Sequence, residues 1–292
     1  MKNDIISLNQ VHKSFSHKPV LKGLSFSVKP GELVALLGAN GAGKTTTMNI
    51  LLGLEQADSG TISILGQQPG THNVKLDVGV TPQGTDFPEG LKVIEVLELV
   101  AAHYKNAMSI EQTIAQFSLE DIAGQLTAGL SYGQKRRVAV ALAFIGHPKL
   151  IFLDEPTTGL DVQSRHALWS VIKDYVQAGG TLVLTTHYLE EAEKLATKIL
   201  VLDDGVIRSQ GTVNEIIADF GMMSVTFQAE QCPQTLTHAS KIQHEDDLFV
   251  IETTDSDALV RELVDKSVAF RQLAIHKSSL ETAFLEMNQS GE

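Results

Sequence analysis

The stretch from residue 33 to residue 46, LVALLGANGAGKTT, constrains the fold more than any other part of the chain. Its apolar start, residues 33–37, is typical of a buried strand. A glycine-rich turn follows, and a helical-looking segment comes after it. The P-loop pattern, G-x-x-x-x-G-K-[ST], is met by Gly38, Gly43, Lys44 and Thr45. The sequence therefore predicts a strand, a phosphate-binding loop and a helix, in that order.

Polyphosphate chemistry explains the residue types in this loop. Glycine has no Cβ, so backbone N–H groups can converge on phosphate oxygens, and the next helix directs its positive end toward the same anion. Lys44 can reach the β- and γ-phosphates, and the Thr45 hydroxyl can ligate Mg²⁺. A mere tight turn is the alternative, which the strand-before and helix-after context disfavours. The candidate nucleotide-binding residues here are Gly38, Asn40, Gly41, Ala42, Gly43, Lys44, Thr45 and Thr46.

Composition narrows the class of protein. The 292 residues, 43% hydrophobic and 20% charged, are typical of a globular protein with one large domain or two smaller ones. The net charge of −12 without a basic tract argues against nucleic acid as a partner. Cys232 is the only cysteine, which excludes an intrachain disulfide. We see no signal peptide and no apolar run of the roughly 20 residues that a spanning helix needs, so we expect the chain itself not to cross a membrane.

Two further apolar runs end in polar side chains. Residues 150–153 lead directly into Asp154 and Glu155, and residues 181–186 lead into His187. Adjacent carboxylates at the end of a buried strand are costly unless they face a cleft or a metal. Open α/β sheets bind ligands beyond the carboxyl ends of their strands. We therefore expect these three residues and the P-loop to form one nucleotide site.

For three patterns the residues alone do not decide between interpretations. In LSYGQKRR, residues 130–137, Ser131 is a good N-cap, but the three cations that follow oppose the helix dipole. They either meet a bound anion or an acidic partner, or extend into water. Phe15 is either a core aromatic residue, which its pattern favours, or a ring stacked on a base. Gln83, after a short strand at 78–81, means little alone.

The remaining patterns predict the domain organisation. Strands are expected at 5–14, 20–29 and 61–66, a helical region at 91–122, and a hairpin turning at Asp204-Gly205. After a break near 218–221, the pattern predicts strands at 223–227, 248–252 and 270–275 and helices at 258–266 and 278–287. We therefore predict a domain at 1–220 with a helical subdomain at about 86–148, and a small α+β domain at 221–292.

Together these stretches resemble the ATP-binding subunits of ABC transporters over residues 4 to 220 or so. LSYGQ, residues 130–134, is similar to the LSGGQ signature, which is far more specific than a P-loop. Gln83, Asp161 and His187 stand where the family has its Q-loop, D-loop and H-loop. The resemblance implies an α/β fold: a P-loop NTPase core with an N-terminal antiparallel β subdomain and a helical insert, plus the small C-terminal α+β domain.

The resemblance also implies roles for single residues. Two ATPase domains would pair head to tail, with each ATP between one P-loop and the signature of the partner. Glu155 would polarise the attacking water, His187 would sense the γ-phosphate, and Lys44 completes the candidate catalytic set. Mg²⁺ would be held by Thr45, Gln83 and Asp154. The nucleotide contacts outside the P-loop would be Phe15, now stacked on adenine, with Ser131, Gly133, Gln134 and Asp161.

The sequence departs from the family pattern at two of these positions. Tyr132 replaces the usual glycine of the signature, and Phe15 replaces the commoner tyrosine. A tyrosine at 132 leaves Ser131 and the Gly133 amide free, so we expect ATP hydrolysis.

The ending SLETAFL, residues 279–285, is similar to the tail of ATPase subunits from ABC-2-type exporters, including drug-resistance systems. The implied function is an ATPase that powers a separate integral membrane permease, for export of a small molecule or drug-like substrate. It would act as a homodimer, peripheral at the cytoplasmic face of the inner membrane. The alternative is a soluble ABC-type ATPase acting on nucleic acid or ribosomes. Such proteins usually carry two cassettes, a coiled-coil insertion or zinc cysteines, and none is evident here. A P-loop kinase, the third class, would not explain the signature stretch.

Overall fold

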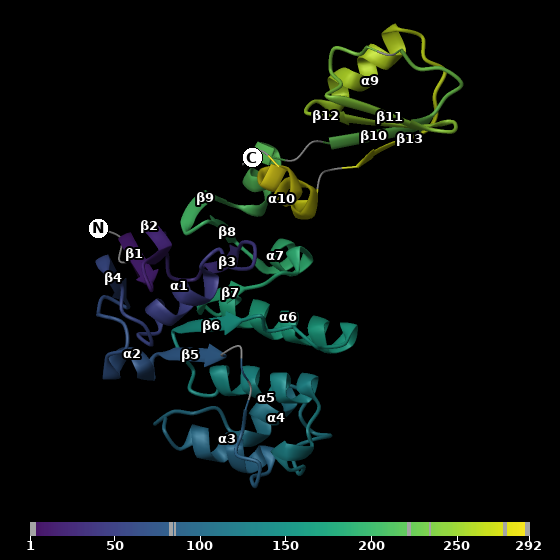
Figure 1. Ribbon diagram of the computed structural model, residues 1–292. Coiled ribbons are helices and arrows are strands. Elements are labelled where there is room, and N and C mark those ends of the chain that lie inside the picture. The colour runs from purple at the N-terminus through teal and green to yellow at the C-terminus, as the bar shows by residue number, and fades with distance from the viewer. Residues whose placement is uncertain are drawn as a thin grey trace. The chain divides into compact units, whose positions relative to one another are not determined.

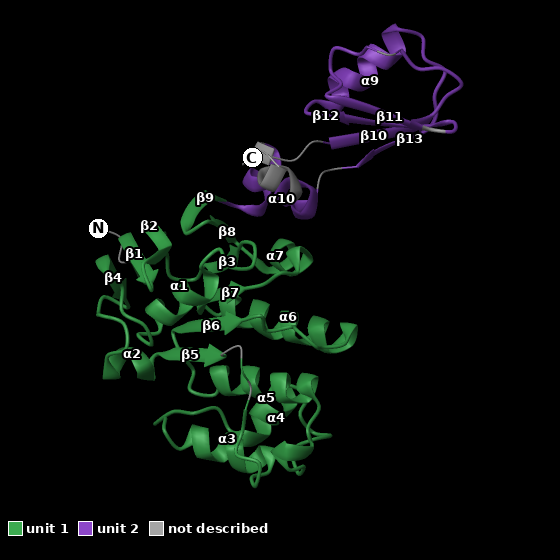
Figure 2. Cartoon of the chain, viewed as in Figure 1, with its two compact units in different colours: residues 1–210 green, residues 211–292 purple. Residues whose placement is uncertain are grey.

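A computed structural model describes residues 4–81, 84, 86–220, 223–233, 235–276 and 279–289. The chain divides into two compact units, residues 1–210 and 211–292 (Figure 2). The division comes before the predicted boundary at 220, because α8 (Val213–Phe220) packs against α10 (Leu280–Gln289) in the second unit.

A six-stranded sheet forms the centre of unit 1 (Figure 1). Its strand order is β5 (Val78–Thr81), β6 (Leu150–Asp154), β7 (Thr181–Thr185), β3 (Leu33–Leu37), β8 (Lys198–Asp203) and β9 (Val206–Gly211). Neighbouring strands from β5 through β8 pair in parallel. β3 and β7 are buried at every residue, as expected of apolar strands covered on both faces.

Helices connect the parallel strands. α1 (Lys44–Leu51) follows β3, α6 (Val162–Gln177) joins β6 to β7, and α7 (Leu189–Leu195) joins β7 to β8. Because the strands are parallel, the segments that follow β3, β6 and β7 all leave the sheet at the same edge. This topology places the P-loop, Asp154 with Glu155, and His187 along one edge.

The N-terminal part of unit 1 is an antiparallel sheet, as predicted. Its order is β2 (Lys18–Val28), β1 (Ile6–Phe15) and β4 (Ser59–Ile64), and α2 (His72–Leu76) follows β4. Apolar side chains from this sheet share one core with those of the central sheet, among them Leu24, Phe26, Leu36 and Leu200. The small sheet is therefore part of the same folded unit as the P-loop.

A helical insert lies between β5 and β6. It contains α3 (Val93–Ala101), α4 (Ile110–Gln116), a 3₁₀ turn (Thr127–Gly129) and α5 (Tyr132–Phe144). The region predicted as helical at 91–122 is two helices, because Ser109 starts a new one with a capping box to Gln112. α5 packs against β5 and β6, so the insert is attached to the edge of the central sheet.

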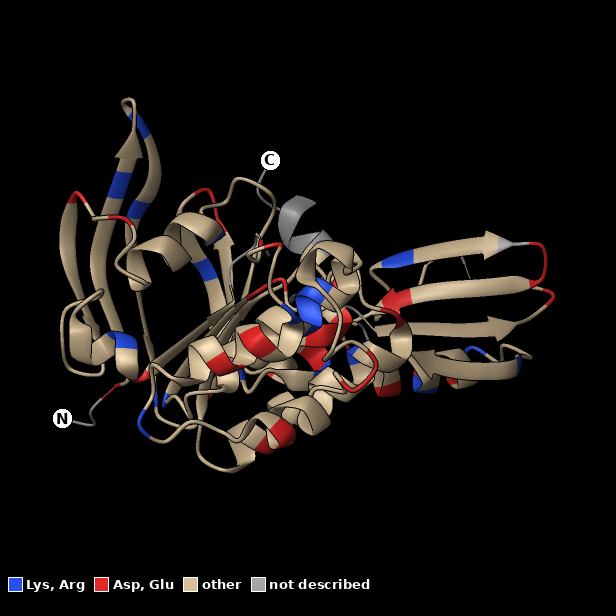
Figure 3. Cartoon of the chain, turned by 90° about the horizontal axis from the view of Figure 1, so that it is seen from below, with Lys and Arg blue, Asp and Glu red and all other residues tan. Residues whose placement is uncertain are grey.

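Unit 2 is a small α+β domain. Its antiparallel sheet has the order β11 (Lys241–Glu245), β12 (Leu248–Thr253), β10 (Met223–Gln228) and β13 (Arg271–His276). Leu259 and Leu263 of α9 (Ser256–Asp265) pack in a core with Phe227 and Ile251. The sequence did not predict β11, because KIQHE has a single apolar residue. Figure 3 shows acidic and basic positions interspersed over the elements of both units.

Candidate active site

The P-loop is a sharp glycine turn between β3 and α1. Gly38 is required by packing, because a Cβ there would come within 2.2 Å of the Leu202 carbonyl oxygen on β8. Gly41 and Gly43 have φ angles of 86° and 109°, in the region that favours glycine. Asn40 and Gly41 are exposed. The loop thus presents bare backbone to solvent at the start of α1, where N–H groups lack helical acceptors.

Lys44 folds back over this loop. Its Nζ donates to the carbonyl oxygens of Gly38 at 2.7 Å and Ala39 at 3.1 Å. Burial lowers the pKa of Lys44, whereas the nearby charges of Glu155 and Asp154 act to raise it. The ammonium group is therefore close to the loop, and it interacts electrostatically with the carboxylates at the end of β6.

The other P-loop residues differ in exposure. Thr45 is exposed and Thr46 is half-buried, whereas Thr47 is buried and donates to the Gly43 carbonyl at 2.9 Å. Ala42 is buried, and its carbonyl accepts from the Gly205 N–H at 3.1 Å. Thr45 is thus the hydroxyl available to a ligand, and Ala42 anchors the loop to the β8–β9 turn.

Asp154 and Glu155 occupy different environments although they are adjacent. Asp154 ends β6 opposite Thr185, and the Thr185 hydroxyl donates to its carboxylate. The backbone N–H of Glu155 donates to the Thr185 carbonyl at 3.1 Å. Glu155 has φ 52°, a conformation that costs a non-glycine residue about 1–3 kcal/mol. The strained residue turns the chain off the strand at the predicted site.

Glu155 and His187 are in direct contact. The His187 Nδ1 lies 2.5 Å from Glu155 Oε2, and the His187 backbone N–H donates to the same oxygen at 3.4 Å. Thr158 Oγ1 donates to it at 3.4 Å. His187 is 54% exposed and Glu155 18%. The structure therefore brings together the two strand ends, as the sequence predicted, with His187 at the surface.

The signature stretch begins α5, on a different element from the P-loop. Ser131 is the N-cap: its Oγ accepts from the Gln134 N–H at 3.3 Å, and its own N–H donates to Gln134 Oε1 at 2.9 Å. The ring of Tyr132 packs on Gly159, since a Cβ at Gly159 would lie 2.5 Å from a ring carbon. A Cβ at Gly133 would lie 2.6 Å from the Gly159 carbonyl oxygen. Gln134 thus completes the N-terminal capping box of α5, and Tyr132 packs the signature against the turn after β6.

Two cations of α5 have partners within the chain, which neither interpretation of the sequence foresaw. Arg136 is 1% exposed, and burial lowers its pKa, whereas electrostatic interactions with Tyr132 and then with Asp154, Glu155 and Glu191 act to raise it. Arg137 donates to the Ser118 carbonyl at 2.5 Å and pairs with Asp121 at 3.4 Å. The alternative in which these side chains extend into water is therefore wrong for both, whereas the alternative that this helix end meets a bound anion or an acidic partner stays a prediction.

The last predicted residues lie outside this cluster. Asp161 is the N-cap of α6, where the N–H and the hydroxyl of Ser164 each donate to it at 2.8 Å and lower its pKa. Phe15 is 40% exposed at the end of β1, with Lys13 Nζ 4.9 Å from its ring centre. The pattern-based preference for a core Phe15 is therefore wrong. Gln83 lies outside the described residues.

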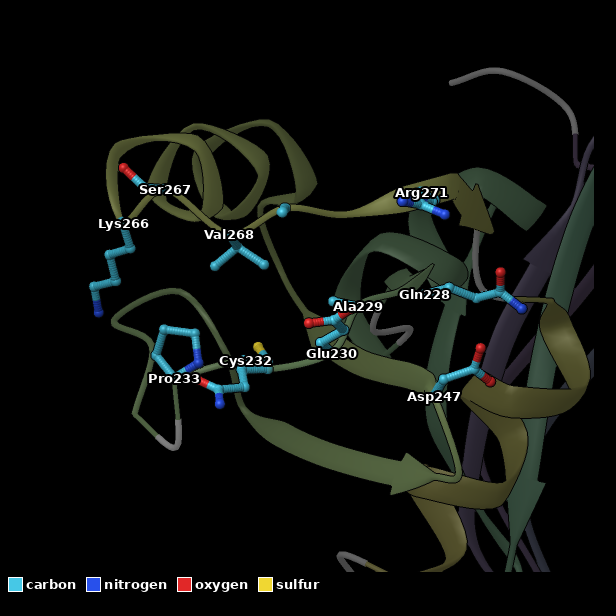
Figure 4. A pocket seen from close by; sticks show the side chains of 12 residues that line it. Gln228, Ala229, Glu230, Cys232, Pro233, Asp247, Lys266, Ser267, Val268 and Arg271 are labelled. Atoms are coloured by element: carbon cyan, nitrogen blue, oxygen red, sulfur yellow. The ribbon is translucent and has the colours of Figure 1, made fainter.

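The P-loop, Asp154, Glu155 and His187 line neither of two cavities found in the described part of the chain. The larger, about 840 Å³, is in unit 2 and is bordered by Cys232, Asp247 and Lys266 among others (Figure 4). The smaller, about 230 Å³, lies among α4, α5 and α6. The P-loop with Glu155 and His187 forms an open surface site.

Residues 21–158 match the family described as ABC transporter. "Nod factor export ATP-binding protein I" of Ralstonia nicotianae (strain ATCC BAA-1114 / GMI1000) is 39% identical over 220 residues, which cover 73% of this chain and 68% of that protein. The chain belongs to the ABC transporter family. The protein of the same name from Paraburkholderia xenovorans (strain LB400) is 40% identical to this ABC ATPase over 222 residues, covering 73% of this chain and 72% of the relative.

Solved structures place the fold in the same family. The structure of an ATP-binding subunit of an ABC transporter superposes with a TM-score of 0.68 at 30% identity, covering 74% of this chain and 93% of that one. A dimeric post-hydrolysis ATP-binding cassette bound to ADP and Pi has a TM-score of 0.65 at 26% identity, covering 71% and 98%. The predicted fold class is confirmed, and the chain is the ATP-hydrolysing, ATP-binding subunit of an ABC transporter. Within the described residues, every helix is too short or too polar to cross a membrane.

Proposed function

We propose that this ABC ATPase powers a separate integral membrane permease, and that the complex exports a small molecule or drug-like substrate. The names of the relatives, which specify Nod factor export, support the direction of transport. The similarity of residues 279–285 to the tails of ABC-2-type exporters supports that subfamily. The subunit would be held by its permease at the cytoplasmic face of the inner membrane.

The contact between Glu155 and His187 carries the catalytic part of the proposal. Glu155 accepts a proton from the attacking water, whose oxygen bonds to the γ-phosphorus while the bond to the β–γ bridging oxygen breaks. ADP and phosphate are the products. His187 orients the Glu155 carboxylate and is exposed enough to reach the γ-phosphate. Lys44 neutralises charge that develops on the phosphate oxygens.

Thr45 and Asp154 fit a Mg²⁺ site. Magnesium prefers oxygen ligands, and in such sites it is bound by one or two protein groups together with substrate phosphates. Thr45 is exposed at the start of α1, and the Thr185 hydroxyl orients Asp154. Gln83 is the third proposed ligand. The described residues include no cluster of three His, Cys, Asp or Glu side chains, so phosphate would supply the remaining ligands. When bound, Mg²⁺ would polarise the phosphoryl group.

A second copy of the chain would complete each ATP site. Ser131 and Gly133 would then contact ATP held by the P-loop of the other copy, and Phe15 would stack on adenine. The position of the signature on α5, away from α1, and the similarity to a dimeric cassette support this arrangement. Gln134 and Asp161 would act by shaping loops at this surface, because their side chains cap α5 and α6.

Co-purification of the Glu155→Gln protein from native membranes tests the proposal. This change keeps the shape of the side chain but removes the base, so ATP-bound dimers should accumulate and retain the permease. We expect a protein with several membrane spans to co-purify in mild detergent with ATP. When the same preparation is made with the Lys44→Ala protein, the amount of membrane protein recovered should no longer depend on ATP. Recovery with ribosomes or DNA and no membrane protein would contradict the proposal and favour the soluble alternative.

A further inference from the structure

A carboxylate that none of the motifs includes is buried behind the active site. Glu191 of α7 has no exposed surface, and its Oε1 accepts from the indole Nε1 of Trp169 on α6 at 3.0 Å. A buried carboxylate is costly unless hydrogen bonds compensate it. This interaction joins α6, the helix that follows the D-loop, to α7, the helix that follows His187.

The start of α7 extends this contact to the active site. Burial raises the pKa of Glu191, and hydrogen bonding, including that from Trp169, acts to lower it. The backbone N–H of Glu191 donates to the Tyr188 carbonyl at 3.0 Å. Thr186, which is 1% exposed, immediately precedes His187, and its Oγ1 accepts from the backbone N–H of Tyr188 at 3.0 Å. Glu191 is therefore bonded through its backbone to the loop that carries His187.

The signature helix is joined to the turn after Glu155 by packing. The ring of Tyr132 lies against Gly159, where a Cβ would come within 2.5 Å of a ring carbon.

A second link runs from α6 to His187. The guanidinium of Arg165 lies 4.9 Å from the ring centre of Tyr188, and the rings of Tyr188 and His187 are 4.1 Å apart. A displacement of α6 would therefore act on His187 through two paths.

We propose that Glu191, with Trp169, is a positioning residue that holds α6 against α7 and thereby keeps the loop that carries His187 beside Glu155. The inference rests on the proposed function, in which His187 orients the Glu155 carboxylate for attack on ATP. Glu191 itself touches no nucleotide.

Three variants test this role. Glu191→Ala removes the carboxylate, Glu191→Gln keeps an acceptor for the indole, and Trp169→Phe keeps the ring but removes the N–H. Glu190→Gln is the matched control, because Glu190 is the exposed neighbour on α7. For Glu191→Ala we expect kcat for ATP hydrolysis to fall about tenfold, with ATP affinity within about twofold. Gln at 191 should restore most of kcat.

The single tryptophan supplies a second readout. Trp169 is the only one in the chain, so intrinsic fluorescence reports this contact alone. In the Glu155→Gln background, ATP should shift the emission, and Glu191→Ala should abolish the shift. Unchanged kcat and an unchanged emission shift in Glu191→Ala would overturn the inference, as would an equal loss of kcat and ATP affinity. If Glu191→Ala does not fold, Trp169→Phe decides by the same kinetic criteria. A parent that neither hydrolyses ATP nor pairs would instead contradict the proposed function.

Discussion

Both units combine a β-sheet with helices, but they differ in where their interacting polar side chains lie. In unit 1, Asp154, Glu155, Thr185 and His187 interact with one another where two buried parallel strands end. In unit 2, the carboxylate of Glu262 accepts from backbone N–H groups of the loop at 237–238 and from Lys266, and so serves local structure. The larger cavity nevertheless lies in unit 2. Converging polar groups at strand ends therefore indicate chemistry better than cavity size does.

The largest effect on ATP hydrolysis is expected from replacing Lys44 of unit 1, and replacement of Lys266 of unit 2 is the comparison. Lys44→Ala should lower ATP hydrolysis about 100- to 1000-fold, because it removes a cation that stabilises charge developing on phosphate. Lys266→Ala in unit 2 should leave hydrolysis unchanged, because among the described residues Lys266 bonds to Glu262 and the Thr235 carbonyl of its own unit. The rate of phosphate release measures ATP hydrolysis by both variants. An equal loss of hydrolysis in the two variants would contradict the functional distinction between the units.

Alanine substitutions at two glycines of unit 1 test whether close packing of the signature matters for ATP hydrolysis. Gly133→Ala should lower hydrolysis at least about tenfold, because its methyl would meet the Gly159 carbonyl oxygen at 2.6 Å and displace the signature. Gly129→Ala is the matched control, since a Cβ there meets nothing within 4 Å. Steady-state hydrolysis and melting temperature should be measured together. Equal activities of the two variants would show that this close contact is unimportant.

A core substitution tests whether unit 2 folds separately from the chemistry. Phe227 is fully buried, so Phe227→Ala should reduce the free energy of unfolding of unit 2 by about 3–5 kcal/mol. Hydrogen exchange resolved by peptide should show faster exchange in 223–276 than in the parent, and ATP hydrolysis should persist. Ser224→Ala, on the other face of β10, should change neither. Faster exchange at the P-loop would contradict the separation.

The smallest expected effect is on the pH dependence of the stability of unit 2. Hydrogen bonds from the Thr237 backbone and from Lys266 lower the pKa of Glu262 from 4.5 to about 2. A lowered folded-state pKa means that this stabilisation is present above pH 4.5 and is lost as pH falls toward about 2. Denaturant unfolding of unit 2 should therefore depend less on pH in Glu262→Gln than in the parent over that interval. Parallel pH dependences would show that this network contributes nothing to stability.

Local signals predicted much of unit 1. The apolar runs 33–37, 150–153 and 181–186 became strands because each is bounded by a clear turn or polar signal. Strand register cannot be read locally, so the contact between Thr185 and Asp154 was missed. Arg136 was misjudged because its burial follows from the packing of α5 against the central sheet, which no local pattern specifies.

Signals in unit 2 were weaker. The edge strand β11 has too few apolar residues for an alternating pattern, and the fold alone reveals its pairing with β12. The division at 210 depends on α8 packing against a helix some 60 residues later in the chain, which no local pattern specifies.

The most direct test of the central claim combines three measurements on the Glu155→Gln protein: ATP binding, self-association by light scattering, and single-turnover hydrolysis. The account predicts that the variant binds ATP, forms dimers when ATP is present, and hydrolyses it at least about 100 times more slowly than the parent. Hydrolysis at the parental rate would contradict the assignment of Glu155 as the base in this ABC ATPase.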